Sequence, residues 1–264
     1  MLKKSVVNRK SILNINNQDD VFPLKWSWII LLLTLPLPIL SEYSGLDIWL
    51  VNIYYDTATA TFPWRHVAWF SAWFHDGLRS ALLIVPISLL TLWIMTRISP
   101  STLDNVVPKR WQQPKLLAYL FWATLIGPMI VGLLKAYTTR HCPWSLAMYG
   151  GLEPYYDLWS APLFTLTEAG KCFPGGHASG GYGLLAFVPL MSGVNRWRML
   201  ALALFVGSFM GWVRMMQGAH FLSHNLWTAW LCWAGIITCY GIFRPDQQNN
   251  DEGGKGCFEV NKHD

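Results

Sequence analysis

The chain has 264 residues, of which 53% are hydrophobic and only 13% are charged, and it contains 16 tryptophans. A soluble domain of this length does not need so many aromatic and so few charged residues, so the composition indicates a multi-pass membrane protein. The net charge of +5 does not indicate a nucleic-acid partner, because the lysines and arginines are scattered between apolar runs and form no basic stripe.

Residues 1–23 are polar and basic and do not resemble a cleavable signal. The apolar stretch that follows has no small-residue cleavage site, so we interpret it as a retained first span. The expected organisation is a cytoplasmic tail over 1–23, a membrane domain over 24–243 and a disordered cytoplasmic tail over 244–264, where charges of both signs occur without an apolar period.

A bilayer core about 30 Å thick is crossed by a helix of about 20 mostly apolar residues. Six runs fit this requirement, and they predict an all-α fold, a six-span transmembrane helical bundle: 24–42, 79–96, 115–134, 178–194, 199–217 and 225–243. Pro36 and Pro38 predict a kink in the first helix. The aromatic-rich segment 43–78 predicts an interfacial helix in the headgroup zone, with a lid or lipid entrance as the alternative.

The distribution of basic residues predicts the orientation of the spans. One side of the bundle, including both tails, carries 14 of the 20 lysines and arginines, so the positive-inside rule places both termini in the cytoplasm. With six spans, three polar clusters then meet at the outer face, where they form a predicted active site. They include Lys135, His177, Arg214, His220 and His224.

The cluster that contains Arg214, His220 and His224 has the residue types for phosphoryl transfer. A neutral imidazole can attack phosphorus if an acceptor holds its second nitrogen proton, and His224 is placed to orient His220 in this way. The guanidinium of Arg214 can bind phosphate oxygens with a two-pronged contact. The alternative is that both histidines are solvated interfacial residues.

The run from Phe173 to His177 comes just before a predicted span. Gly175 and Gly176 let the backbone approach an anion closely, at the positive end of the following helix. His177 is placed to protonate a leaving oxygen. The alternative is a simple turn into the membrane that His177 caps.

The third cluster follows the third predicted span and supplies Lys135 and Arg140. Both side chains are candidates for phosphate binding. Cations at a helix C-terminus are favourable in any case, so the alternative is that these side chains only reach toward the headgroups.

In chain order, these stretches resemble the three signature motifs of the type 2 phosphatidic acid phosphatase superfamily. The matching residues are Lys135 with Pro143, Pro174-x-Gly-His177 and Arg214-x5-His220. That family also includes vanadium haloperoxidases, a less suitable role because their chemistry uses soluble substrates and bound vanadate. The likeness covers roughly residues 115–243, and six spans suit the integral-membrane branch.

The resemblance implies a phosphohistidine formed on His220, with His177 as the acid for the leaving group. It also implies a phosphate site made by two cations and two backbone amides, those of Lys135, Arg214, Gly175 and Gly176. It implies no metal and no cofactor.

The chain departs from the family pattern at three positions. Gly175 stands where the family usually has Ser, His224 stands where it usually has Asp, and Cys142 stands where it usually has Arg. Arg140 lies two positions before Cys142, and its long stem can reach the same oxygens. These departures suggest a divergent subfamily and leave a weak or specialised activity open.

Cys142 and Cys172 lie beside two of the motifs on the predicted outer side. An oxidising periplasm would permit them to pair and to clamp two phosphate-binding segments together, so we hypothesise this disulfide, with free thiols as the alternative.

The leading functional prediction is an inner-membrane phosphatase of a bacterium that acts on a lipid-linked phosphate monoester or diphosphate at the periplasmic face. Phosphatidic acid, phosphatidylglycerol phosphate, lipid A and a polyprenyl diphosphate all fit, and the sequence does not choose between them. One alternative is a lipid phosphotransferase that uses the same phosphohistidine. Another is a non-catalytic protein that binds lipid headgroups. The oligomeric state is left open.

Overall fold

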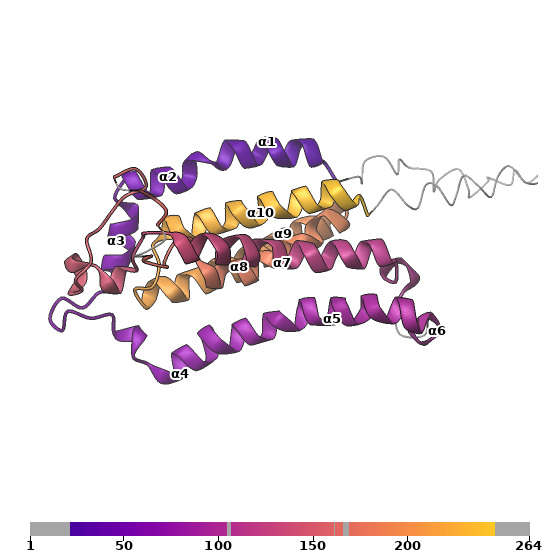
Figure 1. The fold of residues 1–264 in the computed structure, drawn as a ribbon, viewed down its shortest axis with the longest axis horizontal. Coiled ribbons are helices and arrows are strands. Elements are labelled where there is room, and N and C mark those ends of the chain that lie inside the picture. The colour runs from indigo at the N-terminus through magenta and orange to yellow at the C-terminus, as the bar shows by residue number, and fades with distance from the viewer. Residues whose placement is uncertain (1–21, 105–106, 161, 166–168, 246–264) are drawn as a thin grey trace, which may run out of the picture.

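The computed structural model describes residues 22–104, 107–160, 162–165 and 169–245. The predicted tails lie outside these residues, except for 22–23 and 244–245. The described residues form helices and no β-strand, with extended pairing limited to isolated bridges. The longer helices run side by side along one direction (Figure 1): α1 (Leu24–Thr34), α2 (Pro36–Tyr43), α5 (Leu78–Ile98), α7 (Pro114–Tyr137), α9 (Gly193–Met216) and α10 (Leu222–Phe243).

Five helical runs in the described part are long and apolar enough to cross a membrane. They are Leu24–Tyr43, Ala68–Ile98, Pro114–Tyr137, Gly193–Met216 and Leu222–Phe243. Many of their apolar side chains face outward, as lipid contact requires. The chain is therefore an all-helical, multi-pass membrane protein, and five of the six predicted runs coincide with these helices to within a few residues at most ends.

The predicted fourth run, 178–194, is not among the five. It is divided into α8 (Gly176–Tyr182) and the 3-10 helix η6 (Gly183–Leu190). Its glycines allow close packing, since a Cβ on Gly181 would lie 2.6 Å from the Cα of Gly207 in α9. A 3-10 helix rises about 2.0 Å per residue, so α8 and η6 together extend about 26 Å.

The first predicted span is interrupted where its prolines occur. α1 ends at Thr34, and Pro36 is the first residue of α2. A proline inside a helix removes one backbone donor and clashes with the preceding turn, so the chain restarts its helix at Pro36.

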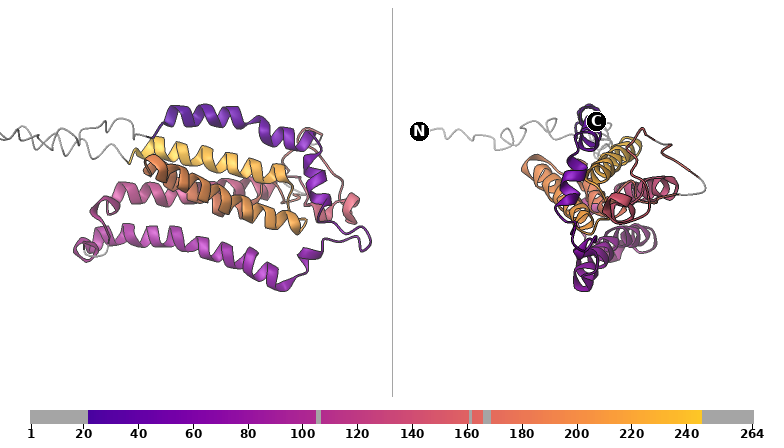
Figure 2. Two further views of the ribbon diagram at one scale, coloured as in Figure 1. Left: turned by 180° about the vertical axis from the view of Figure 1, so that it is seen from behind. Right: turned by 90° about the vertical axis from the view of Figure 1, so that its left-hand side faces the viewer.

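The prediction of one interfacial helix over 43–78 is wrong for its second half. Residues 68–77 form α4 (Ala68–Phe70) and the π-helix η2 (Ser71–Gly77), which continue into α5. The aromatic side chains there pack against α9, with the ring centroids of Phe74 and Phe209 5.7 Å apart. This packing extends the spanning helix. Only α3 (Leu46–Asn52) lies across the end of the bundle, as an interfacial helix would (Figures 1 and 2).

The two ends of the bundle differ in structure (Figures 1 and 2). The start of α1, the end of α5 and the end of α10 lie at one end, whereas α3 and the irregular segment between α7 and α8 lie at the other. A main core joins α7, α8, η6, α9 and α10, and a smaller cluster packs beneath α3: Val51, Phe62, Leu146, Tyr149 and Phe221. The smaller cluster contains Phe221, so it anchors the loop that carries the adjacent His220.

Candidate active site

The loop between α9 and α10 places His220 at the α3 end of the bundle. α9 ends at Met216, and Gly218 takes the left-handed conformation with φ of 67°, in which its amide donates to Met215 O at 2.9 Å. Glycine is the residue that takes this conformation at a helix end without strain. The chain reverses there, and His220 is carried back over the end of α9.

The start of α10 is held by a carboxylate from α3. Asp47 is buried, and its Oδ1 accepts hydrogen bonds from the amide of Ser223 at 2.9 Å and from the hydroxyl of Ser41 at 2.7 Å. Burial raises the pKa of Asp47, while these hydrogen bonds oppose the rise. Asp47 therefore fixes the first turn of α10, which carries His224.

Lys135 and Gly176 approach each other from α7 and α8. A Cβ on Gly176 would lie 3.7 Å from Nζ of Lys135, so the ammonium group stands beside the first turn of α8. Arg214 reaches the same region from the last turn of α9, where its guanidinium donates to Oε1 of Gln217 and lies over the ring of Trp144. The structure thus brings Lys135, Gly176, His177 and Arg214 to one end of the bundle.

His220 is 1% exposed and is surrounded by positive charge. Burial lowers its pKa well below the usual value of 6.5, and the charges of Lys135 and Arg214 act in the same direction. A neutral imidazole is the form that can act as a nucleophile. The arrangement therefore favours the reactive form of His220 at neutral pH.

Several buried polar atoms at this end find no hydrogen-bond partner among the described residues. They are Nε2 of His220, both ring nitrogens of His177, Nδ1 of His224, Nε of Arg214 and Oδ1 of Asn225. Buried polar groups in proteins are nearly always paired, so a group of unpaired ones around two cations indicates a site that takes a polar, anionic ligand.

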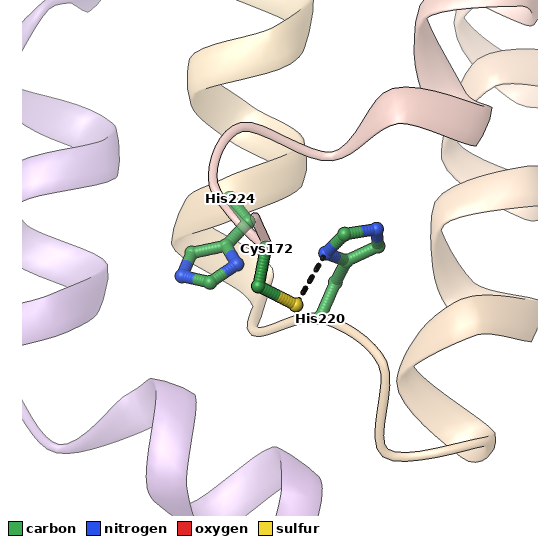
Figure 3. Close-up of side chains that lie close together, drawn as sticks. All are labelled: Cys172, His220 and His224. Carbon is green, nitrogen blue, oxygen red and sulfur yellow. Dashed lines mark hydrogen bonds between the residues drawn. The ribbon is translucent and has the colours of Figure 1, made fainter. Parts of the chain in front are cut away.

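His224 lies beside His220 without a hydrogen bond between their side chains. The two ring centroids are 5.8 Å apart. The side chain of Cys172 stands between the two rings, and its Sγ is 3.7 Å from Nδ1 of His220 (Figure 3). We expected the side chain of His224 beside a ring nitrogen of His220, and Sγ of Cys172 lies there instead.

Cys142 and Cys172 form a disulfide in the structure, with their Cα atoms 5.1 Å apart. One donor atom from each of Cys172, His220 and His224 lies within 4.8 Å of the others, a spacing that a metal ion can bridge. A metal binds the thiolate form of cysteine, and the sulfur of a disulfide carries no such charge. The trio with an intact disulfide is therefore not a metal centre.

Arg140 does not join the cations around His220. Its guanidinium donates to the hydroxyl of Thr139 at 3.0 Å and to the carbonyl of Leu158 at 3.2 Å. It lines a second, small cavity together with Glu42, Asp47 and His224. The structure therefore does not bring Arg140 to Lys135 and Arg214, and its role as a replacement for the missing motif arginine stays a prediction.

The two predicted backbone amides differ in their availability. The amide of Gly175 donates to the carbonyl of His224 at 3.1 Å, so in this structure it is not free to bind phosphate. The amide of Gly176 begins α8, where a helix provides no internal acceptor. Of these two amides, only that of Gly176 is available to bind phosphate.

Sequence reasoning missed His75, which belongs to the π-helix η2. Its ring is 3.9 Å from the ring of His177, centroid to centroid, and its Nδ1 is 2.8 Å from the carboxylate of Asp76. The same π-helix supplies Ser71, whose hydroxyl accepts a hydrogen bond from Gln217 at 3.0 Å. π-Helical turns often occur at functional sites, but no pattern in the sequence marks this one.

A cavity of about 350 Å³ opens from the site between α5, α7 and α8. Its polar lining includes Lys135, His177 and Arg79, a cation that sequence reasoning did not place in the site. Most of the remaining lining is apolar: Leu82, Leu83, Val85, Pro86, Leu125 and Leu184. The shape and lining suit an anionic group attached to a hydrocarbon chain.

Among known proteins, the model of the PAP2 superfamily matches residues 116–247. The chain belongs to the PAP2 superfamily. No curated protein and no solved structure matches the chain at a significant level. Membership of the PAP2 superfamily implies phosphatase activity on phosphate esters, often those of lipids.

The match includes every motif residue from Lys135 to His224 and excludes α1 to α5. The superfamily assignment therefore agrees with the resemblance seen in the sequence. The helices outside the match supply Asp47, His75 and Arg79, which contact Ser223, contact His177 and line the cavity, respectively.

Proposed function

We propose that this protein is a membrane phosphatase that hydrolyses a lipid-linked phosphate monoester or diphosphate through a phosphohistidine on His220. The proposed location is the periplasmic face of a bacterial inner membrane. The observation that carries the proposal is the cavity whose polar end contains Lys135 and His177 and whose walls are apolar side chains of α5, α7 and α8. In a lipid phosphate, the phosphate group fits the polar end of this cavity and the hydrocarbon chain fits its apolar walls.

In the proposed reaction, Lys135 and Arg214 bind the phosphate oxygens. Nε2 of His220 attacks phosphorus, and the bond from phosphorus to the leaving oxygen breaks as His177 gives that oxygen a proton. His177 then takes a proton from water, whose oxygen attacks the phosphohistidine. The P–N bond breaks, phosphate leaves, and His220 regains its lone pair.

The membrane topology is part of the proposal. α7 ends at the site, α8 begins there, and α9 ends there again at Arg214, so α8 and η6 must return the chain to the opposite end of the bundle. Their combined length of about 26 Å is close to the thickness of a bilayer core. We propose that Gly176–Leu190 is the sixth crossing, despite its short length.

The test is phosphate release by the purified protein from a panel of lipid phosphates: phosphatidic acid, phosphatidylglycerol phosphate, lipid A and a polyprenyl diphosphate. We expect His220→Ala to lower kcat at least about a thousandfold, as loss of a nucleophile does, and His177→Ala to lower it about 10²- to 10⁴-fold. The exposed His66 provides a matched control, and His66→Ala should keep wild-type activity.

Equal phosphate release by the wild type, His220→Ala and His177→Ala would remove the catalytic assignment. Radiolabelled phosphate that appears on an added lipid acceptor instead of in solution would replace hydrolysis by phosphoryl transfer. Acid-labile label bound to the wild type and absent from His220→Ala would support the phosphohistidine.

A further inference from the structure

The disulfide between Cys142 and Cys172 is in direct contact with the proposed nucleophile. Sγ of Cys172 lies 3.7 Å from Nδ1 of His220, within the range for a hydrogen bond to sulfur. Nε2 of the same ring is buried and finds no partner in the described part of the chain. The His220 ring is therefore in contact with sulfur at Nδ1 and has no partner at Nε2 in the described residues (Figure 3).

The disulfide joins loops that are also connected by backbone hydrogen bonds. The amide of Cys172 donates to Arg140 O at 3.1 Å, and the amide of Trp144 donates to Gly218 O at 2.9 Å. Cys172 is fully buried, so its sulfur cannot turn toward solvent. The crosslink thus holds one sulfur in place between the rings of His220 and His224.

The chemistry of this sulfur limits the hydrogen bond that it can form with His220. A disulfide sulfur has lone pairs and no hydrogen, so toward Nδ1 it can accept a hydrogen bond but cannot donate one. When Nδ1 carries the proton of a neutral imidazole, Nε2 carries the lone pair that a nucleophile needs.

We propose that the Cys142–Cys172 disulfide positions the nucleophile, with Sγ of Cys172 accepting the Nδ1 proton of His220. Cys172 is then a positioning residue, and it takes the orienting task that sequence reasoning gave to His224. This inference rests on the proposed phosphatase function. It deepens that function by making the site depend on an oxidised pair of cysteines.

Reduction of the disulfide should therefore slow the enzyme. A dithiol reductant transfers two electrons and two protons, the S–S bond breaks, and each cysteine becomes a thiol while the dithiol is oxidised to its own disulfide. The freed thiol of Cys172 can donate to Nδ1 as well as accept from it, and its sulfur is no longer tethered beside the ring. A part of the His220 population then takes the tautomer with the proton on Nε2, which has no lone pair at the attacking nitrogen.

The sharpest test compares two double variants that both lack the crosslink. Cys142→Ala/Cys172→Ser keeps an oxygen that can accept the Nδ1 proton, whereas Cys142→Ala/Cys172→Ala keeps no acceptor. We expect the Ser variant to form phosphohistidine at least about tenfold faster than the Ala variant, at equal thermal stability, because only the Ala variant leaves Nδ1 unpaired. Cys232→Ala, at a buried free cysteine of α10, is the matched control and should behave as the wild type.

A second measurement does not depend on turnover. Nitrogen chemical shifts of ¹⁵N-histidine-labelled protein, with the His220 signals assigned by their loss in His220→Gln, report which ring nitrogen carries the proton. We expect protonated Nδ1 in the oxidised protein. After reduction we expect a shift toward protonated Nε2, measured with a metal chelator present, because the freed thiol, His220 and His224 could then bind a metal ion.

The outcomes separate the two proposals. Equal phosphohistidine formation by the two double variants, or protonated Nε2 in the oxidised protein, would overturn the positioning role and leave the phosphatase function intact. A folded, disulfide-bonded wild type without activity on any lipid of the panel would remove the proposed function, and this inference with it.

Discussion

At the scale of single residues, Gly175 shows why this chain departs from the usual motif. A Cβ there would lie 2.5 Å from Oδ1 of Asn225, and a Cβ on Gly211 of α9 would also come within 3 Å of the Asn225 side chain. Asn225 therefore fills the space that two glycines leave. A larger side chain at position 175 therefore requires a smaller one at position 225.

Gly175→Ser, which restores the residue that the family usually has, should destabilise the wild-type chain. We expect a loss of about 1–3 kcal/mol, as for an overpacked core, measured as a lower Tm in detergent. Adding Asn225→Ala should recover much of this loss by removing the clash. Gly132→Ser is the control, because a Cβ there meets nothing within 4 Å. Equal Tm values for Gly175→Ser and the wild type would contradict this explanation.

The lowered pKa of His220 predicts the pH dependence of activity. Protonation of His220 removes the attacking lone pair, and a lowered pKa moves this protonation to lower pH. The acidic limb of kcat/KM, which reports the free enzyme, should therefore lie below pH 6.5. Two substrates whose phosphates differ in pKa should share this limb if it belongs to the enzyme. A shared midpoint at or above 6.5 would show that His220 is not shielded as the structure indicates.

At the scale of secondary-structure elements, helices from the N-terminal half complete a site whose motif residues come from the C-terminal half. Asp47 of α3 holds the first turn of α10, and the ring of His75 of the π-helix η2 contacts the ring of His177 of α8. Neither residue lies in the part of the chain that matches the family. The site therefore depends on how α3 and α5 pack against the common core.

Replacement of Asp47 tests this dependence. Asp47→Ala should cost about 1–3 kcal/mol of stability, because the buried amide of Ser223 loses its acceptor. Asp47→Asn keeps an oxygen at the same place and should cost less. Thermal unfolding followed by tryptophan fluorescence measures the difference. If the two variants unfold at the same temperature, the hydrogen bond to Ser223 does not hold α10.

At the scale of the whole molecule, the disulfide and the site lie at the same end of the bundle. Disulfides persist in oxidising compartments, which for a bacterial inner membrane means the periplasm. The excess of basic residues on the other side supports the same orientation. Two independent properties, redox chemistry and charge, thus agree on the proposed topology.

Single cysteines labelled with a membrane-impermeant maleimide test the orientation in intact cells. In a Cys257→Ser background, Leu152→Cys should react, because Leu152 is 95% exposed at the site end. Ser101→Cys, on the exposed helix α6 (Pro100–Leu103) at the opposite end, should react only after the membrane is permeabilised. The reverse labelling pattern would place the site in the cytoplasm.

The sequence by itself determined the membrane class, five spanning helices and the clusters of Lys135, His177, Arg214 and His220. These features are local: a span needs about 20 apolar residues in a row, and a motif needs fixed spacing along the chain. Alternating directions of successive spans were enough to predict that distant clusters meet at one end.

Only the tertiary structure decided which atoms approach each other there. Arg140 donates to the carbonyl of Leu158, the amide of Gly175 donates to the carbonyl of His224, and the sulfur of Cys172 lies beside Nδ1 of His220. Residues 68–77 join the spanning helix because their rings pack on α9. Each of these results depends on contacts between segments far apart in the chain, which spacing and periodicity do not encode.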